Sequence, residues 1–271
     1  MKVFDFNIHL PLIQSNNINE VIHQDMTLSV DELCQNLQLY YSVFKSLEGA
    51  NLMLFNQNLL NNQNIQPFVD QCSNTLKHFL LTTLIDYSQD NVLEYIEKAY
   101  SQGIRAIMFN SYLQKIASFD HEKILHISKF AAEQGMLICI DTSYGTTKMY
   151  DYDNLKLACF IADHISESPI ILIHSGGSRL IEAMLVALDK PNIYLDTSFS
   201  LPFYLGSSLE QDFAFTLNKI GSHRILFGSD NPYITFDHAV NQYLKFFEKY
   251  NFRESDIKNV MYHTAMGLLN E

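Results

Sequence analysis

Eight short apolar runs, separated by segments with helical periodicity, recur along the 271-residue chain. Their ends follow one another about every 32 residues, which is the spacing of repeated strand–helix units. Short apolar runs of this kind are typical of buried parallel strands. The expected strands are 3–10, 51–57, 78–86, 105–110, 136–141, 170–174, 192–196 and 224–228. The pattern predicts an α/β fold, a TIM-type (β/α)8 barrel, in a single domain over residues 1–271.

A doubly wound open sheet is the competing architecture for alternating strands and helices. The barrel is favoured because no Gly-x-Gly-x-x-Gly follows the first expected strand, and because polar residues end strands along the whole chain. The first helix is expected from Ser29, an N-cap with Glu32 three residues later, to Gly49. Helices 237–250 and 255–269 follow the last strand, so the barrel carries an extra C-terminal helix.

Composition and charge restrict the partners that the protein can bind and the cellular compartment in which it is expected. The formal net charge of −12 argues against nucleic acid, because binding a polyanion needs a basic face. No apolar run approaches the length of a membrane span, and an acid at position 5 comes too early for a secretory signal. We expect a cytoplasmic protein without membrane contact. Its cysteines form no Cys-x-x-Cys pair and are expected as free thiols, with 139 and 159 buried: Cys34, Cys72, Cys139 and Cys159.

Asp230 stands at the carboxyl end of the last expected strand, where the run 225–228 stops at Ser229-Asp-Asn-Pro232. Burying a carboxylate there is costly unless it meets a cation, a metal or several donors. A site in the barrel mouth is one explanation. Capping of the following helix is the other, because Asp, Asn and Pro also suit a helix start.

Four separate strands end in His or Asp, and in a closed barrel all four side chains project from the carboxyl-terminal mouth. They are His9, Asp141, His174 and Asp230. Alternation in the first strand should place Asp5, Asn7 and His9 on one face, with Phe4, Phe6, Ile8 and Leu10 on the other. Two imidazoles and two carboxylates in one cavity need a compensating cation or shared protons. A divalent metal would supply that charge.

At these residues the chain resembles the amidohydrolase superfamily, in its amidohydrolase-related branch. The resemblance lies in Asp5-Phe-Asn-Ile-His9, Ile173-His-Ser-Gly-Gly177 and Phe227-Gly-Ser-Asp-Asn-Pro232, which look like the first-, sixth- and eighth-strand motifs. That branch includes metal-dependent decarboxylases of aromatic acids, lactonases, and a pyrone-dicarboxylate lactonase that works without metal. This chain departs from it twice. Asn7 stands where the family usually has the first His of His-x-His, and Asp141 replaces the fifth-strand His.

The resemblance implies a metal site built from His9, Asp141, Asp230 and, more weakly, Asn7. An amide oxygen is a poor ligand beside imidazole, so zinc affinity should fall, and the harder set suits manganese, magnesium or iron somewhat better. His174 would then hold a water or a substrate oxygen. In the metal-free alternative, Asp230 activates water directly.

Several further residues could bind the substrate. The candidate donors are Arg179, Tyr144 and Lys148, and Gly176 and Gly177 would let the backbone approach an anion at a helix start. Asn56, Asn110 and Tyr233 lie at strand ends and could line the mouth. The aromatic-rich segment 199–205 is expected to be either a lid or a contact surface in a homo-oligomer.

The expected function is hydrolysis of a small ester, lactone or amide, with Asp230 and His174 as catalytic residues and a divalent ion assisting. Decarboxylation of a small unsaturated carboxylic acid would use the same site. A barrel that binds a ligand without turnover is the third alternative, motivated by the loss of two usual imidazoles. In each case the partner is a small molecule.

Overall fold

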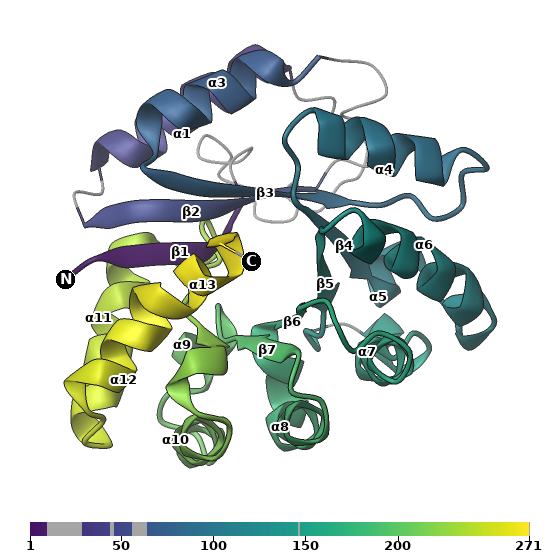
Figure 1. The fold of residues 1–271 in the computed structure, drawn as a ribbon. Coiled ribbons are helices and arrows are strands. Elements are labelled where there is room, and N and C mark those ends of the chain that lie inside the picture. The colour runs from purple at the N-terminus through teal and green to yellow at the C-terminus, as the bar shows by residue number, and fades with distance from the viewer. Residues whose placement is uncertain (10–28, 44–45, 56–63, 146, 271) are drawn as a thin grey trace.

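The structure is a computed structural model that describes residues 1–9, 29–43, 46–55, 64–145 and 147–270. Eight parallel strands follow one another in chain order around a single sheet (Figure 1). They are β1 (Val3–Ile8), β2 (Leu47–Leu54), β3 (His78–Leu84), β4 (Ala106–Asn110), β5 (Leu137–Asp141), β6 (Ile170–Ile173), β7 (Ile193–Asp196) and β8 (Ile225–Leu226). The predicted TIM barrel is confirmed.

Backbone hydrogen bonds bring the end of the sheet back to its beginning. The amide of Phe6 donates to the carbonyl of Phe227, and the amide of Asp230 donates to the carbonyl of Asn7, each at 2.9 Å. Phe227, which supplies the acceptor, and Asp230, which supplies the donor, both lie beyond the two residues of β8. The barrel is therefore nearly closed by the segment that carries Asp230.

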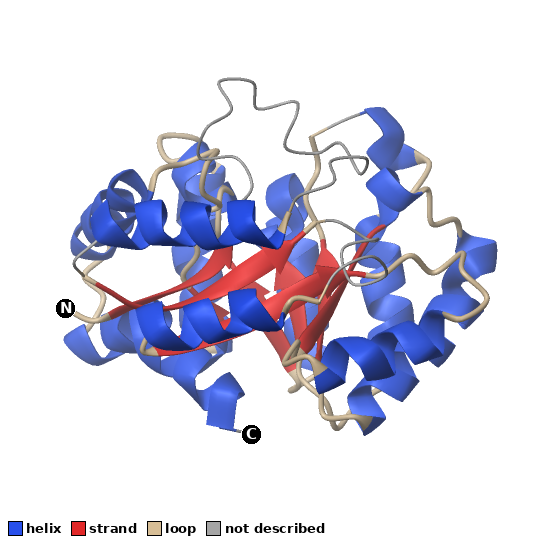
Figure 2. Ribbon diagram, turned by 90° about the horizontal axis from the view of Figure 1, so that it is seen from above, coloured by secondary structure: helices blue, strands red, loops and turns tan. Residues whose placement is uncertain are grey.

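Helices surround the strands on the outside (Figure 2). They are α1 (Val30–Val43), α3 (Gln66–Thr75), α4 (Val92–Ser101), α5 (Ser111–Gln114), α6 (His121–Glu133), α7 (Asn154–Ala162), α8 (Leu180–Asp189), α9 (Ser200–Tyr204), α10 (Leu209–Ile220), α11 (Phe236–Lys249), α12 (Glu254–Lys258) and α13 (Thr264–Asn270). A π-helical turn, Asn259–His263, joins α12 to α13, so the extra C-terminal helix is present. The capping box before α1 is confirmed, because the Glu32 amide donates to Ser29 Oγ at 3.2 Å and the Ser29 amide to Glu32 Oε2 at 2.8 Å.

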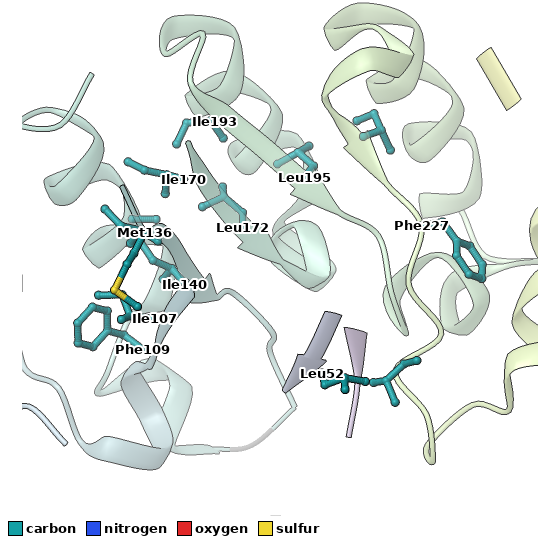
Figure 3. Close-up of a cluster of buried hydrophobic side chains, with 14 of the residues drawn as sticks. Leu52, Ile107, Phe109, Met136, Ile140, Ile170, Leu172, Ile193, Leu195 and Phe227 are labelled. Carbon is teal, nitrogen blue, oxygen red and sulfur yellow. The ribbon is translucent and has the colours of Figure 1, made fainter. Parts of the chain in front are cut away.

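Two apolar clusters share the strand side chains between them. The outer cluster joins residues such as Leu52, Ile107 and Leu172 to the helices (Figure 3). The inner cluster takes alternate positions on the same strands and fills the barrel, and Tyr262, Ala265 and Leu268 of the C-terminal helices belong to it. Alternation with a period of two explains the division, because successive side chains of a strand point to opposite faces.

Three local expectations are wrong. Gly49 does not end the first helix but lies inside β2, where any side chain would strike the Phe4 ring, 2.6 Å from the position of a Cβ. The first strand does not alternate throughout: Phe4 and Phe6 join the inner cluster and Ile8 the outer one, because the pairing of β1 with β2 shifts between Asp5 and Ile8. Finally, Cys159 is exposed.

All four cysteines are free thiols, as expected, and Cys139 is buried inside the barrel. Within the described ranges, none of the helices has the length and apolar character needed to cross a membrane.

Candidate functional site

A cavity of about 400 Å³ opens where the strands end, and residues at or after the ends of β1, β2, β4, β5, β6, β7 and β8 line it. The structure brings His9, Asp141, His174 and Asp230 to this one cavity. Of the other residues proposed from the sequence, Asn7, Asn110, Tyr144 and Tyr233 also line it. Strand ends from distant parts of the chain therefore build the site, as expected at the carboxyl-terminal face of a TIM barrel.

Asp230 is held by His9. The Nε2 atom of His9 lies 3.1 Å from Asp230 Oδ1, and both side chains are buried. Asp230 does not cap the next helix, because the N-cap position of α11 is Thr235. Of the two explanations for this aspartate, the structure therefore supports a place in the barrel mouth.

The charge of Asp230 is set by its neighbours. Burial alone would raise the pKa of this carboxyl, but the positive charge of His174 and the hydrogen bond from His9 outweigh that effect and lower the pKa below its ordinary value. Asp230 is therefore a carboxylate at neutral pH, able to accept a proton.

His174 is positioned by hydrogen bonds to the last residue of β7 and to the residues that follow it. Its ring Nδ1 donates to the carbonyl oxygen of Ser198 at 3.0 Å, and its backbone amide donates to Asp196 Oδ2 at 3.3 Å. Burial lowers the pKa of His174, but the carboxylates of Asp230, Asp141 and Asp196 raise it to about 9. The ring is consequently an imidazolium at neutral pH, and its Nε2 remains for the cavity.

Two buried carboxylates that were not proposed as site residues support this arrangement. Asp196 accepts the amide of Ser198 at 3.2 Å as well as that of His174. Asp5 accepts both the amide and the hydroxyl of Ser229, at 2.8 and 2.5 Å, and so fixes the residue just before Asp230. A signal for both was present in the sequence, since Asp196 ends an apolar run and Asp5 precedes Asn7.

Gly228 lets the segment after β8 approach Asp196 and Ser198 at the end of β7. A Cβ at this position would lie 2.7 Å from the Cβ of Ser198 and 2.8 Å from Asp196 Oδ1. Real Cβ atoms are not found at such distances from backbone-fixed groups. The glycine of the Phe-Gly-Ser-Asp motif is thus required for packing β7 against the end of β8.

Asp141 is already paired with polar neighbours of its own. Asn110 faces it across the β4–β5 ladder and donates from Nδ2 to Asp141 Oδ2 at 2.7 Å. The amide of Ser143 donates to the other carboxylate oxygen at 2.8 Å. Tyr112, which also lines the cavity, contacts the Ser143 hydroxyl at 2.9 Å. Asn110 therefore positions Asp141, in addition to facing the cavity.

The structure does not bring Arg179 or Lys148 to the cavity wall. Arg179 pairs with Asp153 at 2.8 Å and with Glu182, and Tyr144 OH donates to Asp153 Oδ1 at 2.7 Å. Lys148 is exposed in the short helix Thr147–Tyr150. Gly177 does line the cavity, and Asn56 falls outside the described residues.

Aromatic side chains form much of the outer wall, and most of them were not singled out from the sequence. Phe199, the residue before α9, and Phe203 and Tyr204, the last two residues of that helix, line the cavity. Phe199 and Phe203 stack with ring centroids 5.2 Å apart. Phe55, which follows β2, also lines the cavity, with its ring centroid 4.7 Å from that of His9. The aromatic-rich segment 199–205 was the signal, and it forms part of the wall.

Left-handed backbone conformations gather at these strand ends. Positive φ angles occur at His174, Ser175, Phe199 and Asp230, all between 53° and 65°. Non-glycine residues rarely adopt this conformation, and its cost is typically about 1–3 kcal/mol each when the surroundings impose it. Three of the four residues line the cavity. The local backbone is thus shaped to aim side chains into the site.

The described residues that line the cavity do not form a closed site for a divalent metal. In the part of the chain that the structure describes, no group of three or more His, Cys, Asp and Glu side chains is arranged to hold a metal ion. Both carboxylate oxygens of Asp141, and Oδ1 of Asp230, already accept hydrogen bonds. Asn7 Oδ1 and His9 Nδ1 are buried without a partner among the described atoms, but they add only a neutral oxygen and one nitrogen. The set does not fit a closed metal site, and the metal roles of His9, Asp141, Asp230 and Asn7 stay a prediction.

The chain is similar in fold to solved TIM-barrel structures. An uncharacterized TIM-barrel protein from Bordetella bronchiseptica is 14% identical with a TM-score of 0.74, over 100% of this chain and 99% of that one. A dihydroxybenzoic acid decarboxylase from a Polaromonas species, with bound manganese and 2-nitroresorcinol, is 15% identical with a TM-score of 0.65, over 100% and 98%. A probable 2-pyrone-4,6-dicarboxylic acid hydrolase from Acinetobacter baumannii is 11% identical with a TM-score of 0.61, over the whole of both chains.

Identities this low establish the fold alone. A comparison with curated proteins found no match. A family model described as Amidohydrolase matches residues 62–270, which is most of the chain. This match and the site motifs agree, and the chain belongs to the amidohydrolase family.

Proposed function

We propose that the protein hydrolyses a small ester or lactone in this cavity. The observation that carries the proposal is the contact of His9 Nε2 with Asp230 Oδ1 at 3.1 Å, in a cavity that His174 also lines. This contact fixes the orientation of the Asp230 carboxylate, and the imidazolium of His174 lines the same cavity. A hydrolase needs these two groups, one to take a proton from water and the other to stabilise the oxygen of the attacked carbonyl.

The reaction follows from the charges of the two groups. Asp230 accepts a proton from a water molecule as the water oxygen forms a bond to the carbonyl carbon. The carbonyl oxygen gains negative charge, which the imidazolium of His174 stabilises from its free Nε2. The bond to the leaving oxygen then breaks, and the protonated Asp230 returns its proton to that oxygen. The products are a carboxylic acid and an alcohol, joined in one molecule when the substrate is a lactone.

Each neighbour has a distinct part in this scheme. His9 orients Asp230, and Ser198 fixes the His174 ring through Nδ1. The low pKa of Asp230 keeps it ionised but weakens it as a base. Stabilisation of the carbonyl oxygen by His174 therefore has to supply a large share of the rate.

Decarboxylation is the second candidate, because a decarboxylase is among the structures of similar fold. Such an enzyme has to hold a carboxylate before releasing carbon dioxide. The described residues that line the cavity include no Lys or Arg for this purpose. Hydrolysis of an uncharged carbonyl group makes no such demand, and we therefore place it first.

The test is an assay of purified protein on a panel of esters, lactones, amides and aromatic carboxylic acids, with Asp230→Asn beside the wild type. Loss of the proton acceptor at nearly constant side-chain volume should lower kcat/KM for the best ester or lactone by about 100-fold or more. The melting temperature is measured in parallel. Turnover of the acids alone would establish the decarboxylase instead, and a variant as active as the wild type would leave Asp230 a structural residue. A barrel that binds ligands without turnover would convert nothing in the panel.

A further inference from the structure

The cavity lacks the side chains that usually bind carboxylates. Lys and Arg are absent from the described residues that line it, and its charged or ionisable side chains are Asp141, Asp230, His9 and His174, besides the tyrosines. Even with both imidazoles protonated, the two carboxylates balance them. The positive charge of His174 already faces the carboxylates of Asp230, Asp141 and Asp196, and its free Nε2 is needed at the reacting carbonyl. A carboxylate elsewhere on a substrate would therefore enter this cavity without a further cation to meet it.

The sequence extends this conclusion to every segment that follows a strand. The segments between each strand and the long helix that follows it are 9–29, 55–65, 85–91, 111–120, 142–153, 174–179, 197–208 and 227–235. Together they contain three Lys and Arg residues, Lys115, Lys148 and Arg179, against eight Asp and Glu. Residues 10–28 and 56–63, which the structure does not describe, contain no Lys or Arg. None of the three cations lines the cavity: Lys115 and Lys148 are exposed, and Arg179 pairs with Asp153 and Glu182.

The wall offers apolar and aromatic contact in place of charge. Seven of the lining residues are aromatic: Phe55, Tyr112, Tyr144, Phe199, Phe203, Tyr204 and Tyr233. The stacked pair of Phe199 and Phe203 is linked to the reacting groups, because Phe199 lies 6.3 Å from the His174 ring and 6.4 Å from Tyr233. A ring bound beside this pair would have its reactive carbonyl near His174 and Asp230. Burial of an aromatic ring in such a wall is favourable, whereas burial of an unpaired carboxylate is not.

We propose that the site selects uncharged aromatic lactones or esters and discriminates against substrates that carry a carboxylate. This inference rests on the proposed hydrolase function and names the substrate class of the same site. It sets the chain apart from the relatives of similar fold whose names include dicarboxylic or hydroxybenzoic acids.

The experiment compares dihydrocoumarin bearing one ring carboxylate with the carboxamide of the same shape. The wild type should hydrolyse the carboxamide with a kcat/KM at least about 10-fold higher, since the carboxylate loses its hydration without gaining a cation. Phe203→Arg places a cation at the wall, and Phe203 is 62% exposed, so the fold should tolerate the change. This variant should narrow or reverse the preference. Phe119→Arg is the matched control, because Phe119 is 86% exposed and does not line the cavity.

The outcomes separate the two proposals. Equal or faster hydrolysis of the carboxylate by the wild type overturns the substrate class and leaves the hydrolase standing. An unchanged preference in Phe203→Arg, or the same change in Phe119→Arg, also overturns it. If neither compound is hydrolysed, the hydrolase proposal fails, and calorimetry with the two corresponding lactams decides the selectivity. Tighter binding of the neutral lactam supports the inference; tighter binding of the carboxylate, or no binding of either, overturns it.

Discussion

His9 Nε2 and Asp230 Oδ1 lie 3.1 Å apart although 221 positions separate the two residues in the chain. Each residue stands just past the end of its strand, and the backbone joins them too, because the His9 amide donates to the carbonyl of Asn231 at 2.9 Å. The seam that closes the barrel and the proposed reactive pair are therefore one structure. Disturbing the seam should therefore disturb the reaction as well.

The first prediction concerns the alkaline limit of activity. His174, with its pKa raised to about 9, should lose its proton near pH 9, and kcat/KM for a neutral lactone should fall by half there. Asp196→Asn removes one of the carboxylates that raise this pKa, so the alkaline limit should move to lower pH. A pH profile of kcat/KM for both proteins gives the measurement. An alkaline limit at the same pH in both would contradict the assigned role of Asp196.

Protonation of His174 should also affect the stability of the folded protein. Because the pKa of His174 is raised above its ordinary value of 6.5, its stabilising contribution is complete below pH 6.5 and is lost as the pH rises through about 9. The urea midpoint of the wild type should therefore fall between pH 7 and 10 by more than that of His174→Gln. Parallel curves for the two proteins would show that His174 is not charged in the folded state.

The second prediction concerns metal affinity. In Asn7→His with Asp141→His, two imidazoles replace an amide and a carboxylate, so zinc affinity measured by calorimetry should rise. The wild type should bind zinc weakly, because its carboxylate oxygens already accept hydrogen bonds from His9, Asn110 and Ser143. If the wild type binds zinc as tightly as the double variant, Asp141 is a full ligand. If neither binds, the direct action of Asp230 on water gains support.

The third prediction is that Arg179 does not contact the substrate. Its guanidinium is already engaged by Asp153 and Glu182, and it lies outside the cavity wall. Arg179→Met should therefore change kcat/KM for a neutral lactone by less than about threefold, since the guanidinium does not line the cavity and partly exposed ion pairs contribute little to the fold. The control is Asn110→Ala, which removes the donor to Asp141 inside the site and should cost more. A tenfold increase of KM in Arg179→Met would show that the arginine reaches the substrate.

The fourth prediction concerns packing at the end of β8. Gly228→Ala would press a methyl group against Ser198 and Asp196, and should lower the free energy of unfolding by about 1–3 kcal/mol. Gly267→Ala in α13 is the matched control, because a Cβ there meets nothing within 4 Å. It should be neutral or stabilise by up to about 1 kcal/mol, as an alanine does in a helix. Denaturant unfolding of both variants measures the difference, and equal stabilities would contradict the close approach at Gly228.

Hydrophobic periodicity by itself determined the alternation of buried strands and helices, since runs such as 136–141 and 170–174 are apolar on both faces. The polar residues that end strands along the whole chain, and the absence of a Gly-x-Gly-x-x-Gly after the first strand, then favoured the barrel over an open sheet. Periodicity also located the strand ends, and with them His9, Asp141, His174 and Asp230, because a polar residue ending an apolar run is a local signal. The helix start at Ser29 was equally local, since a capping box lies within four residues.

Only the tertiary structure decided which groups meet. The shift in β1 depends on its pairing with β2, and Gly49 belongs to a strand because it pairs with Phe4 in β1 and His78 in β3, so neither could be read from neighbouring residues. Arg179 was expected at the substrate but is taken by Asp153, 26 residues away. The charges of His174 and Asp230 likewise depend on one another across the barrel. Periodicity is a property of the chain, whereas pairing, burial and pKa depend on distances between segments that only the closed barrel fixes.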